Sequence, residues 1–589
     1  MEKLAALRAQ MKERGLDGYI VVSGDAHNSE YVATHWNVRE WLSGFNGSNG
    51  TVVVTATKAG LWTDGRYFIQ AANQLKGSGI DLFKINEPGV PTYQQFLKDN
   101  LPQDGRLGFD GRTITSADFD ALKKILMDKK ITYAYQEDVA GNLWAARPPM
   151  PTAAAFEHET RFAGLEDKLK LVRDKMKEKG VTAYLVVALD DMAWLTNMRG
   201  SDVLYTPLVY SYALITETEA HLFVEPSKVA GISAKLEARG FTINDYHALN
   251  AKIRTMPTGG KLLYNAKMTN MMLAEAIPGG LKVLRKPDAD IIPFLKAAKS
   301  PTELKNSRNA YVKDSIVYVK MLMWLEKSLA DGKTLHEADV VKFLAEARTH
   351  QPDSLGDSFS TICAYGANAA QMHYRVEGDG AEIKREGFLL VDSGGQYLDG
   401  TTDSTRTIPV GEITAEMKKD FTLIVKSHIN LARAKFLKGT TGHALDMLAR
   451  QPLWEHGMQY KCGTGHGIGY CLGVHEGPQS LSQMATNTTA LVPGMLVTNE
   501  PGVYKEGRHG IRTENVLVVE ELFTNDDGTF YGFSPLTYIP ICLNSIDKEL
   551  LNAPEIEYLN DYHKKVFDTL SPLLSQEEVA WLQNATRAL

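Results

Sequence analysis

Cysteine is scarce in this chain of 589 residues: there are four, Cys363, Cys462, Cys471 and Cys542, and no two form a CxxC pair. Neither a disulfide framework nor a thiolate zinc site is therefore expected. Long apolar runs are also missing, since none approaches the roughly 18 residues of a membrane-spanning helix. Charges interrupt every apolar stretch of residues 1–15, unlike a signal peptide. We expect a cytoplasmic protein that does not associate with membranes.

An excess of basic residues is absent as well. Lys and Arg number 64 against 71 Asp and Glu, and the net charge is −7. A nucleic-acid-binding domain is usually basic, so we expect no nucleic-acid partner. Apolar residues make up 44% and charged residues 23%, which is an ordinary globular balance. At roughly 100–200 residues per domain, the length predicts three or four domains.

The first half of the chain contains a degenerate repeat. The segment 7–32 resembles 172–196, and matching strand-like segments follow in the same order in both copies. Each copy has the pattern of an amphipathic helix, an apolar strand, further strands and another helix, which indicates an α/β domain. A proline cluster at 148–151 is typical of a linker. We place the two domains at 1–150 and 151–299.

A third domain is expected over residues 300–540, with a helical extension at 541–589. Ser300, Pro301 and Glu303 form a helix-start signature ahead of a long apolar-periodic segment that ends near residue 329. Thr334 and Glu337 predict a second helix start of the same kind. Beyond residue 355 the chain is rich in glycine and strand-like, with helices expected near 414–438 and 442–456.

The first segment that carries chemistry is LLVDSGGQYLDGTTDSTRT, residues 389–407. An apolar strand ends in Asp392, a glycine-rich turn follows, and Asp403 begins a second strand. Such a hairpin brings the two carboxylates side by side, where they repel unless a proton or a cation lies between them. The alternative is a solvated turn rich in Asp and Gly, an interpretation that suits Asp399.

The second segment is GTGHGIGYCLGVHEGP, residues 463–478. Glycines flank His466 and allow backbone to approach whatever the imidazole contacts. His475 lies nine residues further on. A nucleotide-binding loop is not favoured, because Ile468 stands where GxGxxG requires its third glycine.

Two short apolar strands each carry a glutamate, Glu500 in VTNEPG and Glu514 in GIRTENV. A lone glutamate in a strand is usually exposed to solvent, but together with two Asp and one His these residues form an oxygen-rich ligand set. Such a set suits a pair of Mn²⁺, Co²⁺, Fe²⁺ or Zn²⁺ ions better than a closed structural zinc site. About four negative charges also match two divalent cations.

These segments resemble the metallopeptidase family of methionine aminopeptidase, prolidase, creatinase and aminopeptidase P, whose members share the pita-bread fold. The resemblance covers the whole chain and is strongest to the three-domain, cytosolic Xaa-Pro aminopeptidases. It implies two creatinase-like α/β domains followed by an α+β pita-bread catalytic domain. The implied metal ligands are all present in this sequence: Asp392, Asp403, His466, Glu500 and Glu514.

The resemblance also implies roles for these and other residues. Asp392 and Asp403 hold one metal, Asp403 and Glu514 bridge to the second, and His466 and Glu500 complete the second site. The other residues implied to bind substrate or to assist catalysis are His373, His475, Tyr504, Arg512 and, from the N-terminal domain, Arg66. A homodimer with two divalent ions per chain, most often Mn²⁺, is expected by the same resemblance.

The expected reaction releases the residue that precedes proline at the N-terminus of short peptides. Two cations roughly 3.5–4 Å apart share a hydroxide that attacks the scissile carbonyl, and Glu500 takes and returns a proton. The main alternative is a prolidase that cleaves only Xaa-Pro dipeptides. A metal-free binding module of the same fold is disfavoured, because such modules lose ligands and this chain keeps all of them.

Overall fold

The computed structural model describes residues 2–163 and 167–589. They form two compact units, one with residues 2–159 and 167–292 and the other with residues 160–163 and 293–589. We call them the front unit and the C-terminal unit. Among the described residues, no helix combines the length and the hydropathy that crossing a membrane requires.

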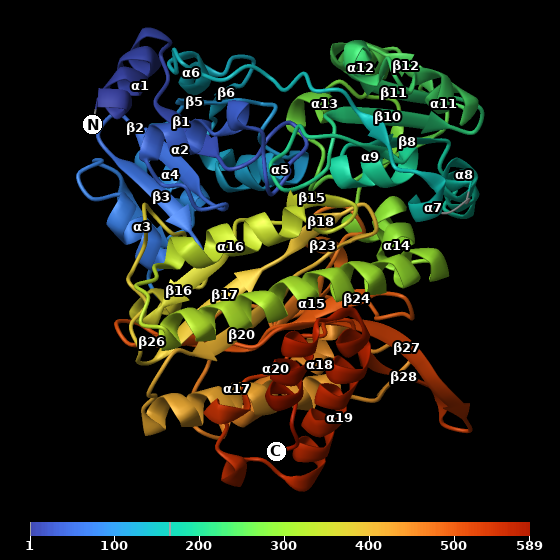
Figure 1. Ribbon diagram of the computed structural model, residues 1–589. Coiled ribbons are helices and arrows are strands. Elements are labelled where there is room, and N and C mark those ends of the chain that lie inside the picture. Colours follow the sequence, from blue (N-terminus) through green and yellow to red (C-terminus); the bar gives the residue numbers. More distant parts are fainter. Residues whose placement is uncertain (1, 164–166) are drawn as a thin grey trace. The chain divides into compact units, whose positions relative to one another are not determined.

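The front unit contains two six-stranded sheets with the same topology (Figure 1). The strand order is β4-β3-β2-β1-β5-β6 in one and β12-β11-β10-β8-β13-β14 in the other, with antiparallel and parallel pairs at matching places. This confirms the internal repeat. The strands are β1 (Gly18–Val22), β2 (Thr51–Thr55), β3 (Ala59–Thr63), β4 (Asp81–Lys84), β5 (Arg106–Phe109), β6 (Thr132–Ala134), β8 (Ala183–Val186), β10 (Ser211–Thr216), β11 (Ala220–Val224), β12 (Thr242–Asn244), β13 (Lys261–Tyr264) and β14 (Lys282–Leu284).

Helices with buried apolar faces pack on these sheets. In α1 (Glu2–Glu13), for example, Leu4, Leu7 and Met11 recur at helical spacing and are all buried. The other longer helices of the front unit are α3 (Phe68–Gln74), α4 (Tyr93–Asn100), α5 (Ser116–Ile125), α8 (Lys168–Glu178) and α9 (Leu189–Thr196).

A buried polar cluster joins the two halves of the front unit. His27 Nδ1 lies 2.7 Å from the carbonyl oxygen of Val187, and its Nε2 lies 2.8 Å from the hydroxyl of Tyr246. The imidazole stacks on Tyr212 with a centroid separation of 4.0 Å. Next to it, the Tyr210 hydroxyl donates to Asp25 Oδ2 at 2.8 Å. Each of these contacts joins a residue of the first repeat to the second repeat.

The C-terminal unit is built on several small sheets. The strand orders are β16-β17-β20, β15-β18-β19 and β21-β28-β27-β24-β22-β23, and β25 pairs with β26. Their bounds are β15 (Ser354–Asp357), β16 (Ile362–Tyr365), β17 (Phe388–Ser393), β18 (Gly395–Tyr397), β19 (Gly400–Thr401), β20 (Ser404–Pro409), β21 (Phe436–Leu437), β22 (Gly465–Gly467), β23 (Glu476–Leu481), β24 (Leu496–Asn499), β25 (Gly502–Lys505), β26 (His509–Arg512), β27 (Asn515–Asn525) and β28 (Gly528–Pro535).

Long helices cover these sheets. Figure 1 shows α15 (Pro301–Ala330) and α16 (Glu337–Thr349) lying across β16, β17 and β20, and buried Val317, Leu344 and Val391 belong to the core between them. The remaining long helices are α17 (Ala415–Ala432), α18 (Gly442–Trp454), α19 (Ala553–Leu570) and α20 (Gln576–Ala585). The mixed α/β architecture that the sequence predicted is confirmed.

Of the local features predicted from the sequence, one helix start is confirmed and two other predictions are wrong. Helix α15 begins with the predicted capping box, in which Ser300 Oγ accepts from the Glu303 amide and Glu303 Oε2 accepts from the Ser300 amide. The predicted box at Thr334 and Glu337 is wrong, because α16 begins later, with His336 at its N-cap. The solvated position suggested for Asp399 is also wrong: this side chain is buried and pairs with Lys313 Nζ at 2.7 Å.

Candidate metal centre

The five predicted ligands lie on separate elements of the C-terminal unit. Asp392 is on β17, Asp403 directly precedes β20, and His466 is the middle residue of β22. Glu500 directly follows β24, and Glu514 lies between β26 and β27. Antiparallel pairing of β17 with β20 brings the two aspartates together in one sheet, and pairing of β24 with β22 and β27 groups the other three ligands in a second sheet. The Glu514 amide, which donates to the Thr405 carbonyl at 3.1 Å, connects the two groups.

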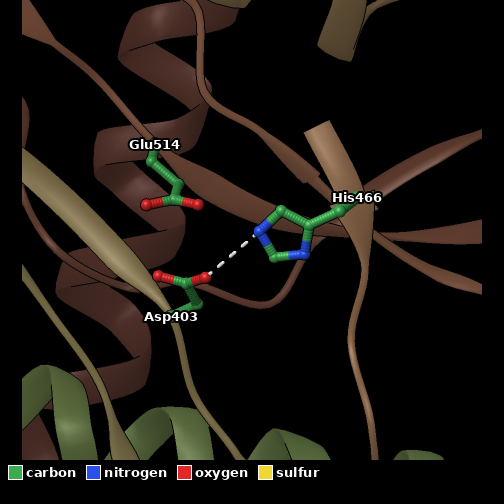
Figure 2. A group of neighbouring side chains, drawn as sticks. All are labelled: Asp403, His466 and Glu514. Atoms are coloured by element: carbon green, nitrogen blue, oxygen red, sulfur yellow. Dashed lines mark ion pairs between the residues drawn. The ribbon is translucent and has the colours of Figure 1, made fainter. Parts of the chain in front are cut away.

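Three of the five converge most closely. Single ligand atoms of Asp403, His466 and Glu514 all lie within 4.8 Å of one another. Figure 2 shows these three side chains pointing toward one another. One nitrogen and two carboxylate groups at that spacing are able to surround a divalent cation.

The backbone of the next residue orients the imidazole of His466. Nδ1 lies 2.9 Å from the carbonyl oxygen of Gly467, so the ring proton is held there. Nε2 then faces the carboxylates, 3.5 Å from Asp403 Oδ2 and 3.4 Å from Glu500 Oε1. A ligating histidine characteristically has its second nitrogen fixed in this way. Glycine is required on either side, because a Cβ at Gly465 would lie 1.9 Å from the Thr498 carbonyl oxygen and a Cβ at Gly467 would lie 2.1 Å from the Glu476 carbonyl oxygen.

The remaining two ligands adjoin this group. The Glu500 amide donates to the Thr464 carbonyl at 2.8 Å, and its Oε1 accepts from the Thr498 hydroxyl at 3.2 Å. Asp392 Oδ2 accepts from the guanidinium of Arg512. Asp392 therefore contacts a protein cation with one oxygen only.

The electrostatics of the site show crowded negative charge. Burial, reinforced by the charge of Asp403, raises the pKa of Glu514 well above its usual range. Burial also raises the pKa of Asp392 to about 7, although Arg512 opposes the shift. Burial alone would lower the pKa of His466, but its interactions with Asp403 and Glu500 raise it to about 9. Carboxylates packed this closely hold protons unless cations neutralise them.

Unsatisfied oxygens show that the donor set fits metal ions. Asp392 Oδ1 and Glu514 Oε1 are buried, and within the described residues neither has a hydrogen-bond partner. A buried acceptor without a partner costs roughly 1–3 kcal/mol, and more when it is charged. Metal coordination would satisfy both atoms, so the residues present suit a pair of divalent cations.

Predicted substrate residues lie around this centre in the C-terminal unit. The His475 ring packs edge-on against His466 with a centroid separation of 4.3 Å. The Arg512 guanidinium donates to the Tyr504 hydroxyl at 2.8 Å as well as to Asp392. His373 lies in the segment after β16, whose neighbouring Met372 carbonyl accepts from Arg512 at 3.4 Å.

Arg66 belongs to the front unit. Its guanidinium pairs with Asp64, two residues earlier, at 2.8 Å from Nε to Oδ1. About 29% of its side chain is exposed, and Asp64 holds the guanidinium locally.

Two supporting residues were not found from the sequence. Thr405 donates to Glu514 Oε2 at 2.7 Å and accepts from Arg512 Nε at 3.2 Å, which connects two of the predicted site residues. Buried Glu337 accepts from the amides of Tyr365 and Ala381 and from the Tyr374 hydroxyl, which ties down the segment that carries His373. The sequence signal for Thr405 is its place two residues after Asp403, whereas the pattern around Glu337 predicts only a helix start.

Models of known protein families match most of the chain. Residues 305–521 match the model of metallopeptidase family M24, and residues 529–589 match the C-terminal region of peptidase M24. Residues 3–137 and 146–303 match two models of the creatinase/prolidase N-terminal domain.

Relatives match over the whole chain. Aminopeptidase P2 of Arabidopsis thaliana is 36% identical, covering 100% of this chain and 88% of the relative. Xaa-Pro aminopeptidase 1 of Dictyostelium discoideum is 36% identical, covering 100% and 96%.

Solved structures of related proteins are also similar to this chain. X-prolyl aminopeptidase from Caenorhabditis elegans, a cytosolic enzyme with a di-nuclear active site, superposes with a TM-score of 0.95 at 33% identity, covering 100% of this chain and 99% of that one. Prolidase from Pyrococcus horikoshii shares the fold, with a TM-score of 0.50 at 22% identity over 64% of this chain and 99% of its own. The chain belongs to metallopeptidase family M24, with creatinase-type N-terminal domains ahead of its catalytic domain.

Proposed function

We propose that this protein is a dinuclear Xaa-Pro aminopeptidase, which removes the N-terminal residue from peptides with proline in the second position. The observation that carries the proposal is the convergence of Asp403, His466 and Glu514 at metal-ligand spacing. Relatives named Xaa-Pro aminopeptidase, matched along the whole chain, support the substrate class. The five ligands are Asp392, Asp403, His466, Glu500 and Glu514.

The metals supply Lewis acidity and lower the pKa of water to near neutrality when they are bound. The chain's own residues do the rest. Glu500, whose pKa burial raises and which lies 3.4 Å from His466 Nε2, is the group that takes and returns a proton. His475 packs against His466 at the side of the ligand group, where it is able to donate to a substrate carbonyl.

Other residues orient the substrate and the ligands. The Xaa-Pro bond is a tertiary amide without an N–H, so recognition depends on the proline ring and on neighbouring carbonyl groups. His373 and His475 serve those carbonyls. Arg512 holds Asp392 and Tyr504 in place. Arg66, from the front unit, binds peptide oxygens with its fork of donors.

Several finer assignments belong to the same proposal. The preferred metal is Mn²⁺, with Zn²⁺ or Co²⁺ as alternatives of similar ligand chemistry. The enzyme is a cytoplasmic homodimer that acts on short peptides. Its domains are residues 1–150, 151–299 and 300–540, with a C-terminal helical extension at 541–589.

One assay separates this proposal from its alternatives. The metal content of the purified protein is measured first. The protein is then incubated with Arg-Pro-Pro or with Gly-Pro in three states: as purified, after chelation, and after chelation followed by addition of Mn²⁺. We expect arginine release from the tripeptide, loss of activity on chelation and recovery with Mn²⁺. Cleavage of the dipeptide alone would instead identify a prolidase. Absence of cleavage by a protein that binds no metal, even after Mn²⁺ is added, would identify a metal-free binding module.

A further inference from the structure

The two aspartate ligands are held in different ways by the backbone. The register of β17 with β20 pairs Asp392 with Thr405 and ends at Ser393 with Ser404. Asp392 therefore lies inside the ladder, whereas Asp403 lies one residue beyond its end. Strand pairing fixes Asp392 but not Asp403. Another part of the fold must fix the backbone at Asp403, which is expected to contact both metals.

One face of helix α15 supplies this support. Tyr311, Asp314 and Tyr318 are spaced i, i+3 and i+7, so they lie on the same face. The Tyr311 hydroxyl accepts from the Asp403 amide at 3.3 Å. Asp314 Oδ2 accepts from the Thr402 hydroxyl at 2.9 Å. The Tyr318 hydroxyl donates to the Ser404 carbonyl. Three consecutive residues, 402–404, are thus each held by one side chain of α15.

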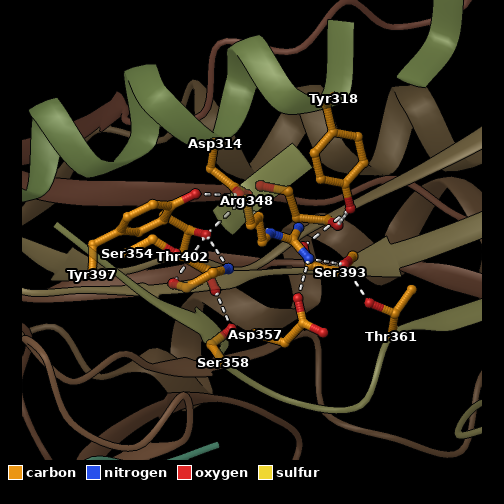
Figure 3. Close-up of polar contacts among 12 residues, drawn as sticks. Asp314, Tyr318, Arg348, Ser354, Asp357, Ser358, Thr361, Ser393, Tyr397 and Thr402 are labelled. Atoms are coloured by element: carbon orange, nitrogen blue, oxygen red, sulfur yellow. Dashed lines mark hydrogen bonds and ion pairs between the residues drawn. The ribbon is translucent and has the colours of Figure 1, made fainter. Parts of the chain in front are cut away.

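The same face also reaches β17, on the side of Asp392. The Tyr318 hydroxyl lies 3.0 Å from the Ser393 carbonyl oxygen. Arg348 of α16 donates from its Nη1 to Ser393 Oγ at 2.6 Å and from its Nε to Asp314 Oδ1 at 2.8 Å. Figure 3 shows Arg348 between Asp314 and Ser393. The Asp314–Arg348 pair therefore connects the residue after Asp392 to the residue before Asp403.

This network is fully buried and carries charge. Asp314 is 1% exposed and Arg348 is 0% exposed. Asp314 Oδ1 also accepts from the Tyr397 hydroxyl at 3.0 Å, and burial raises the pKa of Tyr397, which keeps it a donor. A buried ion pair seldom stabilises a fold more than apolar residues of the same volume would. A geometric role explains its presence better than a contribution to stability.

We propose that Tyr311, Asp314 and Tyr318 of α15, with Arg348 of α16, are positioning residues that set the location of Asp403 relative to Asp392. None of them is expected to touch a metal or the substrate. They act through residues 393 and 402–404, and they determine how tightly the metal pair is held. This inference rests on the proposed dinuclear site.

The test uses the Mn²⁺-loaded enzyme and measures the rate of metal release into excess EDTA. Tyr311→Phe removes only the hydroxyl that accepts from Asp403, and Asp314→Asn removes the charge that Thr402 and Arg348 share. Outer-shell changes typically cost 10–100-fold in metal affinity. We expect metal release to accelerate by about 10-fold or more in each variant, and kcat to fall more than KM rises.

Matched controls come from the front unit. Tyr184→Phe removes an equally buried hydroxyl, which donates to Asp290, and Asp202→Asn breaks the buried pair with Lys228. The controls should lower the melting temperature as much as the test variants do and leave metal release unchanged.

Wild-type metal release in Tyr311→Phe and Asp314→Asn would overturn the inference, as would equal metal loss in the controls. A wild-type enzyme without two metals per chain would instead refute the proposed site itself. If Asp314→Asn does not fold, Tyr311→Phe, which lacks one oxygen atom, decides the question.

Discussion

At the scale of single residues, the carboxylate of Asp403 interacts with three of the other candidate ligands. Its carboxylate lies 3.5 Å from His466 Nε2, and its charge contributes to the raised pKa of both Glu514 and Asp392. Among the described residues, no Lys or Arg side chain pairs with Asp403 as Arg512 pairs with Asp392, and the ion-pair partner of Asp403 is the imidazole of His466. We therefore expect loss of Asp403 or Glu514 to weaken metal binding more than loss of Asp392, whose charge Arg512 partly neutralises.

This asymmetry predicts the effect of removing either carboxylate. Asp403→Asn and Glu514→Gln keep the shape of the side chain and remove the anionic ligand. We expect turnover of Arg-Pro-Pro to fall by more than about 100-fold, beyond the range of outer-shell changes, and metal content to drop below two per chain. Asp399→Asn, which alters a carboxylate paired with Lys313, is the control. Wild-type turnover in either ligand variant would refute the dinuclear assignment.

A second prediction concerns the histidines outside the ligand group. His475→Gln or His373→Gln should lower kcat by about 10²–10⁴-fold, the usual contribution of a general acid or base, while two metals per chain remain bound. Exposed His443→Gln is the control and should change neither quantity. Loss of a metal from the His475 variant would show that His475 is a ligand, contrary to the role proposed here.

At the scale of elements, helix α16 supports the site from both of its ends. Glu337 in its first turn ties down the segment that carries His373, and Arg348 near its end connects the strands that carry the aspartates. Both side chains are buried. A single helix thereby holds in place two parts of the site that are far apart in sequence.

The contact between the two sheets of the front unit is expected to depend on pH. Burial lowers the pKa of His27 to about 4, below the 6.5 of an unfolded histidine. The unfolded chain therefore takes up a proton as pH falls through 6.5, while the folded chain does not until pH 4. The contribution of neutral His27 to the free energy of unfolding should be fully present above pH 6.5. It should decrease by about 1.4 kcal/mol per pH unit as the pH falls from 6.5 to 4.

Thermal unfolding measured across that range checks this prediction. His27→Gln should lower the melting temperature at neutral pH and flatten its decline toward pH 4. Exposed His247→Gln, in the same unit, should leave the decline unchanged. An equally steep decline in the His27 variant would contradict the assignment.

At the scale of the whole molecule, the proposed homodimer needs an apolar surface. Leu582, part of the apolar spacing in the last helix, is buried in the core of the C-terminal unit, so that spacing already has a role within one chain. Leu573 remains 58% exposed, and Leu522 and Phe523 of β27 are each 44% exposed. Contiguous apolar patches mark protein contacts, so these side chains are the positions at which the proposed dimer surface is tested.

We expect the protein in solution to have twice the mass of one chain at micromolar concentration. Sedimentation equilibrium measures this directly. Leu573→Glu and Phe523→Glu test the two exposed sites, because a buried charge at an interface is strongly unfavourable. An active monomer at that concentration would contradict the prediction.

The sequence by itself determined the repeated front half, the order of the five candidate ligands and the reaction class. Apolar periodicity, capping signals and repeated segments are patterns of residues near one another in the sequence, so they can be recognised without the structure. The motif around each ligand also carries its own glycines and neighbouring apolar strand.

Only the tertiary structure decided how these ligands are held. Arg348 and Asp314 lie on different helices, and the sequence around Glu337 predicts only a helix start. Asp399 is buried and pairs with Lys313, 86 positions away. Such partners are chosen by the packing of helices on sheets, because a buried polar group must find its partner wherever the fold places one. No periodicity in the chain records that choice.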